Sequence, residues 1–165
     1  MDDEIYVIVK NRAKSFALAF LDEFLPDREN CSVEFPVPRF SDNPTAVYED
    51  ELQLLDYLEL TERASYGIIW GNLRKNTEIS HAILYYTEDA CMILGIAVSV
   101  DGIGKNGLAK YFRQLAEFSG AEYGYVMGEG PPLDTYAEFI SASKRPDIDR
   151  LYKGKVMVIG HEGAE

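Results

Sequence analysis

Apolar positions recur with two different periods along the chain, and the change of period separates strands from helices. Residues 5–9 form a β-branched run that is typical of a strand. From Asn11 the apolar residues recur at helical spacing as far as Phe24, with Asn11 as the expected N-cap and Pro26 as the stop. The first two elements are therefore predicted to be a strand and an amphipathic helix.

The next stretch is rich in proline, which favours an extended connection. Within it, residues 32–37 are predicted to form at most a short edge strand, because proline is tolerated there. Residues 50–60 return to helical spacing and predict a short acidic helix. Its expected buried stripe is Leu52, Leu55 and Leu58, with Leu54 as a candidate member.

Three β-rich runs follow, at residues 66–70, 79–86 and 91–100. A turn-like tetrapeptide at 87–90 separates the last two, which predicts an antiparallel hairpin. A helix is then expected over residues 107–119, with Asn106 as candidate N-cap and Gly120 just after its end.

The last part of the chain predicts three short elements. They are a strand over residues 123–127, a helix capped by Asp134 that runs to residue 139 or 140, and an edge strand over 155–159. Together the elements predict a single α+β domain over residues 1–165, with 161–165 as a frayed tail. We expect a mainly antiparallel sheet on which the N-terminal helix and the helix after the central hairpin pack, and periodicity leaves the strand order open.

Composition limits the classes of function. The 165 residues include 28 acids and 16 bases, and a formal net charge of -12 at pH 7 argues against general nucleic-acid binding. The apolar stretches are too short for a membrane span and the acidic N-terminus does not resemble a signal peptide, so neither membrane insertion nor secretion is indicated. Cys31 and Cys91 lack CxxC spacing and are expected to be reduced thiols of a cytoplasmic protein.

The acidic charge is concentrated in residues 41–62, which contain no lysine or arginine. The seven acids of this segment are Asp42, Glu49, Asp50, Glu51, Asp56, Glu59 and Glu62. One interpretation is a solvated helical face that keeps the protein soluble. Another is a docking surface for a protein partner with a basic surface, because such charge accelerates encounter. A metal-binding acidic loop is a third.

Gly102, Gly104 and Gly107 match the G-x-G-x-x-G pattern between a predicted strand and a predicted helix. Glu129 lies 22 residues beyond Gly107, near where dinucleotide-binding folds place a ribose-binding acid. However, the preceding strand is predicted to belong to an antiparallel hairpin, and the 38 residues after position 127 are too few for a second mononucleotide-binding half. The alternative is a strand-to-helix connection in which the glycines supply flexibility.

The two histidines do not suggest a catalytic or metal site. His81 alternates with Ile79 and Ile83 along a predicted strand, which favours a hydrogen-bonded, partly buried side chain, and His161 lies in the tail. The sequence lacks the HExxH, paired CxxC, GxSxG and phosphate-loop motifs. It therefore identifies no catalytic residue, no metal ligand and no cofactor.

Aromatic residues are abundant on the predicted strands. They are Tyr66, Trp70, Tyr85, Tyr86, Tyr123 and Tyr125. Because adjacent strand residues point to opposite faces, some of these tyrosines are expected at the surface. Core packing with cross-strand aromatic pairs and a role at a binding interface are both open.

Four groups of residues between positions 24 and 132 carry a resemblance. They are Phe24-Leu25-Pro26-Asp27-Arg28, Tyr-Gly-Ile-Ile-Trp at 66–70, Met92-Ile93-Leu94-Gly95, and Glu122-Tyr123-Gly124-Tyr125 with Glu129-Gly130-Pro131-Pro132. Together they resemble small acidic bacterial α+β proteins of uncertain role, many of which are similar in size and charge to immunity proteins that neutralise polymorphic toxins. The resemblance specifies no reaction and carries over no functional residue.

These observations predict a non-enzymatic protein-binding module of the immunity or inhibitor type. It would occlude a basic partner, such as a toxin, through the acidic segment 41–62 and nearby tyrosines. The alternative is a small-molecule or nucleotide-binding domain that uses the glycine turn at 102–107. The oligomeric state is not indicated.

Overall fold

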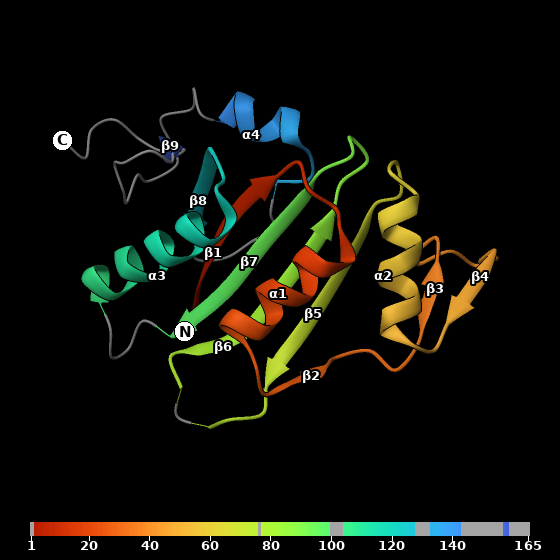
Figure 1. Ribbon diagram of the computed structural model, residues 1–165, viewed down its shortest axis with the longest axis horizontal. Coiled ribbons are helices and arrows are strands. Elements are labelled where there is room, and N and C mark those ends of the chain that lie inside the picture. The colour runs from red at the N-terminus through yellow and green to blue at the C-terminus, as the bar shows by residue number, and fades with distance from the viewer. Residues whose placement is uncertain (1, 76, 100–103, 128–132, 143–156, 159–165) are drawn as a thin grey trace.

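A β-sheet with helices on both faces forms the centre of the protein (Figure 1). The computed structural model describes residues 2–75, 77–99, 104–127, 133–142 and 157–158. The predicted α+β class and the mainly antiparallel sheet are confirmed.

Within the described ranges, seven strands form the main sheet. They are β1 (Asp2–Val9), β2 (Arg28–Asn30), β5 (Tyr66–Asn72), β6 (Ile79–Tyr86), β7 (Met92–Ser99), β8 (Tyr123–Met127) and β9 (Met157–Val158). Their order is β2-β5-β6-β7-β1-β8-β9, and every neighbouring pair is antiparallel except β8 and β9. Because β1 lies between β7 and β8 and runs against both, β7 and β8 are parallel to each other. Two further strands, β3 (Phe35–Val37) and β4 (Ala46–Tyr48), pair separately.

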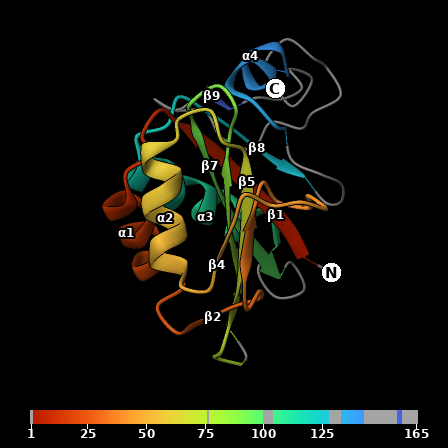
Figure 2. The same ribbon diagram turned by 90° about the vertical axis from the view of Figure 1, so that its right-hand side faces the viewer.

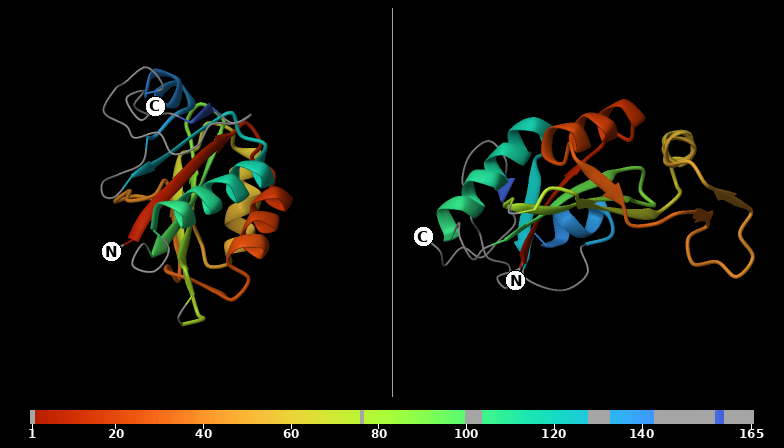
Figure 3. Two further views of the ribbon diagram at one scale, coloured as in Figure 1. Left: turned by 90° about the vertical axis from the view of Figure 1, so that its left-hand side faces the viewer. Right: turned by 90° about the horizontal axis from the view of Figure 1, so that it is seen from below.

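The described residues form four helices. They are α1 (Lys14–Phe24), α2 (Glu51–Leu60), α3 (Gly104–Ser119) and α4 (Tyr136–Ala142). The first three cover one face of the sheet and α4 lies on the other (Figures 2 and 3). The β3–β4 pair extends from the molecule beside α2 (Figure 1).

The strands supply side chains to two apolar clusters, one on each face of the sheet. In β1, Ile5 and Val7 belong to the large cluster packed by α1, α2 and α3, whereas Tyr6 and Ile8 belong to the smaller cluster that contains Phe139 of α4. This alternation is the ordinary period of a strand buried on both faces. Most of the buried apolar side chains therefore lie between the sheet and α1, α2 and α3, and α4 covers a smaller cluster on the other face of the sheet.

Several sequence predictions are confirmed. The hairpin of β6 and β7, joined through residues 87–90, has the expected antiparallel register. Helix α1 ends two residues before Pro26, and Gly120 follows α3 with a φ of 66°, the left-handed conformation that favours glycine after a helix. The predicted edge strand near the C-terminus is present as β9, while residues 155, 156 and 159 lie outside the described residues.

The prediction that Asn11 caps α1 is wrong. The N-cap is Ala13, and Oδ1 of Asn11 accepts a hydrogen bond from the Ala13 N–H at 2.8 Å in the turn before the helix. The first N–H of the helix, that of Lys14, donates instead to Oε1 of Glu59 at 2.6 Å. A carboxylate from α2 thus satisfies a donor at the start of α1, and local sequence spacing cannot reveal such a long-range cap.

The buried stripe of α2 also differs from the prediction. Leu54, Leu55 and Leu58 are buried as expected, but Leu52 is 44% exposed. Residues 54, 55 and 58 already form a continuous helical stripe, and position 52 lies across the helix from its centre. Leu52 therefore lies outside the buried stripe, on the outer side of an acidic helix.

Three further predictions are corrected. Helix α3 begins at Gly104, so Asn106 lies in its first turn rather than before it. Thr135, not Asp134, caps α4, because its Oγ1 accepts a hydrogen bond from the Glu138 N–H at 3.1 Å. His81 is exposed, since a bulge between Ile79 and His81 interrupts the alternation that would have buried it in part.

Arg12 fixes the end of α2 against the sheet. Its side chain is only 7% exposed, and its guanidinium donates to the carbonyl groups of five residues at 2.8–3.2 Å. These acceptors belong to Leu58, Thr61, Ala64, Thr87 and Cys91. Three of them follow one another at the C-terminal end of α2 and two flank the β6–β7 turn, so one buried cation joins both segments.

Candidate functional site

Two of the seven predicted partner-binding acids support the local structure of α2. Asp50 is the N-cap, and its Oδ1 accepts a hydrogen bond from the Leu52 N–H at 2.9 Å. Oε2 of Glu51 accepts from Nε1 of Trp70 at 2.9 Å and from Nδ2 of Asn30 at 2.8 Å. Glu51 therefore satisfies the indole of a buried tryptophan and points toward the sheet.

Two more of these acids meet α1. Oδ1 of Asp56 lies 2.7 Å from Nζ of Lys14, and Glu59 accepts from the backbone N–H of the same residue. The hydrogen bond to Asp56 is the main reason that the pKa of the Lys14 ammonium is raised. Both carboxylates are nevertheless exposed, so they contribute to the surface as well as to helix packing.

The remaining three acids are distributed around α2. Asp42 lies in the connection between β3 and β4, Glu49 precedes α2 and Glu62 follows it. All three are exposed, and within the described residues none makes a hydrogen bond or ion pair through its side chain. The charges of Asp42 and Glu49 therefore face solvent, whereas the charge of Glu62 also acts on the buried Arg12, in the direction that raises the pKa of its guanidinium.

Exposed acids and exposed leucines share the outer side of α2. Glu49, Leu52, Asp56, Glu59 and Leu60 follow one another at intervals of three or four residues, or lie adjacent, and all five are exposed. We call this set the α2 stripe. Leu60 is 81% exposed, so the stripe combines apolar area with negative charge. Tyr57, half-buried on the same helix, packs against Tyr48 with ring centres 5.6 Å apart.

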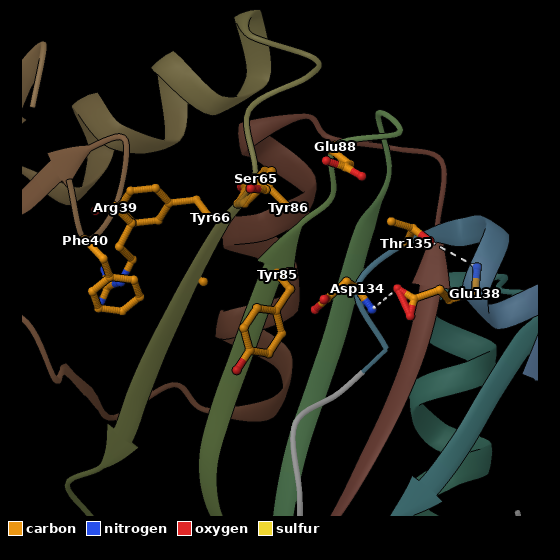
Figure 4. A pocket seen from close by; sticks show the side chains of 11 residues that line it. Arg39, Phe40, Ser65, Tyr66, Tyr85, Tyr86, Glu88, Asp134, Thr135 and Glu138 are labelled. Carbon is orange, nitrogen blue, oxygen red and sulfur yellow. Dashed lines mark hydrogen bonds between the residues drawn. The ribbon is translucent and has the colours of Figure 1, made fainter.

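A second candidate site is a cleft of about 360 Å³ between the β3–β4 connection and α4. Figure 4 shows Arg39 and Phe40 on one side, Tyr85 in the middle, and Asp134, Thr135 and Glu138 on the other side. The remaining lining residues are Ser65, Tyr66, Gly67, Tyr86 and Glu88. We call this the aromatic cleft.

The floor of the aromatic cleft is built by a glycine and a tyrosine on neighbouring strands. Gly67 of β5 pairs with Tyr85 of β6, and a Cβ atom at position 67 would lie 2.5 Å from Cε1 of Tyr85. The absence of a side chain thus allows the ring to lie against the β5 backbone. Burial raises the pKa of the Tyr85 hydroxyl, Glu4 and Asp134 add to that effect, and Arg39 opposes it. The phenol is therefore the neutral centre of a cleft with charges on both sides.

Arg39 and Phe40 form the wall that faces α4. The Arg39 guanidinium lies 5.1 Å from the ring centre of Phe40 and 5.0 Å from that of Tyr66. Phe40 is 89% exposed and has a φ of 64°, a backbone conformation that is rare for a bulky side chain. The protein thus presents a large apolar ring to solvent on a strained backbone.

The opposite wall is held in place by Asp89. Its Oδ2 accepts from the Ala137 N–H at 3.2 Å and its Oδ1 from the Thr87 hydroxyl at 2.6 Å. Burial acts to raise the pKa of Asp89, but hydrogen bonds from Thr87 and from the N–H groups of Tyr136 and Ala137 outweigh it, so the pKa is lowered. An ionised Asp89 therefore joins the first turn of α4 to the β6–β7 turn.

The lining of the aromatic cleft combines aromatic rings with charged side chains. Its described lining contains no histidine or cysteine, and within the described residues no group of three or more His, Cys, Asp or Glu side chains is placed to hold a metal ion. Three of its four charged side chains are carboxylates: Glu88, Asp134 and Glu138. The cleft thus offers aromatic surface with a negative side.

The other sequence candidates are separate from both sites. Gly102, Glu129 and His161 lie outside the described residues, so the dinucleotide alternative stays a prediction. The exposed His81 contacts Ser80 Oγ through Nδ1 at 3.0 Å. The two cysteines are free thiols, Cys31 exposed and Cys91 buried.

Sequence reasoning did not single out the cleft residues, apart from Asp134 and the tyrosines. One available signal was Thr135-x-x-Glu138, a spacing typical of a helix N-terminus. An Arg39-Phe40 pair within a proline-rich connection was another, because a lone aromatic residue in such a segment has no strand or helix to bury it. The juxtaposition of these two segments across Tyr85 has no local signal.

None of the helices in the described ranges is long and apolar enough to cross a lipid bilayer. Comparison of the chain with protein-family models, with curated proteins and with solved structures finds no match.

Proposed function

We propose that the chain is a non-enzymatic protein-binding module of the immunity or inhibitor type, which occludes a partner with a basic surface. The observation that carries the proposal is the α2 stripe, where Leu52 and Leu60 are exposed among Glu49, Asp56 and Glu59. Apolar anchors within a polar, charged surround are the usual anatomy of a protein interface.

The charge of the segment supports a partner with a basic surface. The segment 41–62 carries seven acids and no base. Lys14, which approaches the stripe from α1, is already paired with Asp56. A partner of opposite charge would be steered to this side of the molecule, and Leu60 would then supply desolvated contact area. Tyr57 and Tyr48, half-buried beside the stripe, add aromatic surface.

The internal contacts determine which substitutions test the proposal. Asp50, Glu51, Asp56 and Glu59 each make an intramolecular hydrogen bond or ion pair, so changing them would disturb folding as well as binding. The suitable charge variant is Asp42→Asn/Glu49→Gln/Glu62→Gln. Its matched control is Glu23→Gln/Glu29→Gln/Glu117→Gln, three exposed acids on other elements.

The experiment is capture of the partner from a lysate of the cells that make this protein, followed by binding kinetics with the purified partner. We expect one stoichiometric basic protein, with association slowed about tenfold and its salt dependence flattened in the charge variant but not in the control. Leu60→Ser should accelerate dissociation at least about fivefold, whereas Leu73→Ser, at another exposed leucine, should not. Unchanged kinetics in the charge and Leu60 variants would overturn the proposal.

A further inference from the structure

We propose that the aromatic cleft seats a cationic side chain, arginine or lysine, carried on an extended segment of a partner protein. The kind of partner rests on the proposed function, but the site is new, because its floor residue Tyr85 packs against the smaller apolar cluster on the α4 face of the sheet, away from the α2 stripe (Figure 4). The proposal therefore adds a second contact region to the α2 stripe.

The cleft is formed by the fold itself. Two segments nearly a hundred residues apart in the sequence provide its walls, one containing Arg39 and Phe40 and the other containing Asp134 and Glu138. Its floor is the Tyr85 ring, whose position depends on the missing side chain of Gly67. A volume of about 360 Å³ is near the lower end for ligand pockets and suits one long side chain with its local backbone, not a folded element.

Charge decides the sign of the occupant and its orientation. Glu88, Asp134 and Glu138 give one side of the cleft three carboxylates, and within the described residues none of the three forms an ion pair. The Arg39 guanidinium, on the other side, is directed to the rings of Phe40 and Tyr66. A cation entering the cleft is attracted toward α4 and repelled by Arg39, so its charged end is placed beside Asp134.

The aromatic side chains suit the rest of such an occupant. Arginine and lysine carry an apolar stem that packs on rings while the charged end stays with carboxylates. The outer face of Tyr85 and the exposed ring of Phe40 provide that packing surface, and Tyr85 also offers its π-face to the cation. An aspartate or glutamate would meet three like charges, and an aliphatic side chain would leave the carboxylates uncompensated.

The test uses the isolated full chain and a defined probe. The ¹⁵N-labelled protein is titrated with the capped peptide Ac-Ala-Arg-Ala-NH₂, with Ac-Ala-Glu-Ala-NH₂ as the charge control, up to about 10 mM because a single side chain is expected to bind weakly. We expect amide shifts at Gly67, Tyr85 and Thr135 with the arginine peptide only. Salt should weaken this binding, because the carboxylates are exposed.

Variants assign the binding to the cleft. Glu88→Gln/Asp134→Asn should raise the dissociation constant at least about fivefold, whereas Glu23→Gln/Glu117→Gln, which removes the same charge elsewhere, should change it less than about twofold. Glu138 is left intact because its Oε1 accepts from the Asp134 N–H at 3.3 Å. No saturable shift at Gly67 and Tyr85, or equal shifts with the glutamate peptide, would overturn the proposal.

The two proposals fail separately. Peptide shifts centred on the α2 stripe and insensitive to Glu88→Gln/Asp134→Asn would overturn the cleft as the cation seat and leave the proposed function intact. Peptide binding in the cleft, together with partner kinetics that ignore the charge and Leu60 variants, would overturn the role of the α2 stripe alone.

Discussion

The guanidinium of Arg12 lies 4.9 Å from the ring centre of Tyr86, deep behind the β6–β7 turn. Burial lowers the pKa of Arg12, while the neighbouring Tyr86 acts in the opposite direction. Burial raises the pKa of Tyr86, and Arg12 opposes that effect. The pair is therefore a cation over a neutral ring, in which carbonyl oxygens accept the hydrogen bonds of Arg12 and the charge of Glu62 adds a favourable interaction.

Arg12→Lys should strongly destabilise the protein. A lysine has three donors on one nitrogen and cannot reach acceptors on both α2 and the β6–β7 turn. We expect the free energy of unfolding to fall by about 3 kcal/mol or more in urea titrations, because buried acceptors lose their donors. Arg63→Lys, at an exposed site, is the control and should change it by less than about 0.5 kcal/mol. Equal losses in the two variants would contradict this role.

The hydrogen bond from Trp70 to Glu51 makes a second stability prediction. Trp70 is only 1% exposed, and Glu51→Ala would leave its indole N–H without an acceptor. The expected loss is about 1–3 kcal/mol. Glu51→Gln retains a carbonyl acceptor and should recover part of it. Trp70 is the only tryptophan in the chain, so its fluorescence during denaturation reports both variants directly. A Glu51→Ala variant as stable as the parent would show that this contact contributes nothing.

Two glycines under tyrosine rings should differ in their tolerance of a methyl group. A Cβ atom at Gly95 would lie 2.5 Å from Cε1 of Tyr6, the same separation as at Gly67 from Tyr85. Tyr6 is buried and stacks on Tyr125 with ring centres 5.5 Å apart, whereas Tyr85 borders the cleft and can move outward. Gly95→Ala should therefore cost about 1–3 kcal/mol and Gly67→Ala less, as measured by thermal unfolding. The reverse order would contradict the packing argument.

Asp89 should make the attachment of α4 depend on pH. Because its pKa is lowered in the folded state, its stabilising effect is complete above its ordinary value of 3.8 and is lost as the pH falls through the folded-state pKa. Asp89→Asn should thus be less stable than the parent near neutral pH, and the difference should shrink in acid. Urea titrations at about pH 6 and about pH 3 would measure it. A difference that is the same at both values would exclude the ionised carboxylate as its source.

The backbone of Phe40 predicts an unusual response to glycine. The left-handed conformation at position 40 costs a non-glycine residue about 1–2 kcal/mol, and Phe40→Gly removes that cost. The Phe40 ring is 89% exposed, so its loss removes little buried area. We expect the variant to be at least as stable as the parent despite the greater flexibility of glycine. Phe40→Val, β-branched at the same φ, should be less stable. A clear loss of stability on Phe40→Gly would mean that the ring supports the fold.

Periodicity predicted the helices and the longer strands, but it missed β2 and β4 and, apart from the β6–β7 hairpin, did not indicate which strands pair. Two β-rich runs on either side of a turn-like segment at 87–90 were sufficient to predict the hairpin of β6 and β7. The helix caps were less predictable. Glu59 and Thr135 took roles expected of Asn11 and Asp134, since a cap depends on which acceptor the final geometry brings to a free N–H.

The candidate sites show the same division. The acids of 41–62 are visible as a charge run, but the sequence cannot tell that Glu51 turns inward to Trp70 while Glu49 stays exposed. The aromatic cleft was hidden for a related reason. Its two walls, the β3–β4 connection and the start of α4, are far apart in the sequence and are brought to the same side of β5 and β6 by the fold. No local pattern in the sequence indicates that they face each other.

The position of β1 between β7 and β8 has a consequence for how the chain folds. The first strand of the sequence lies inside the sheet, and its two neighbours are formed by Met92–Ser99 and Tyr123–Met127. Its hydrogen bonds therefore close loops of roughly a hundred residues, which makes their formation slow relative to the local β6–β7 hairpin. During synthesis β1 has to wait, unpaired and apolar, until most of the described chain has left the ribosome.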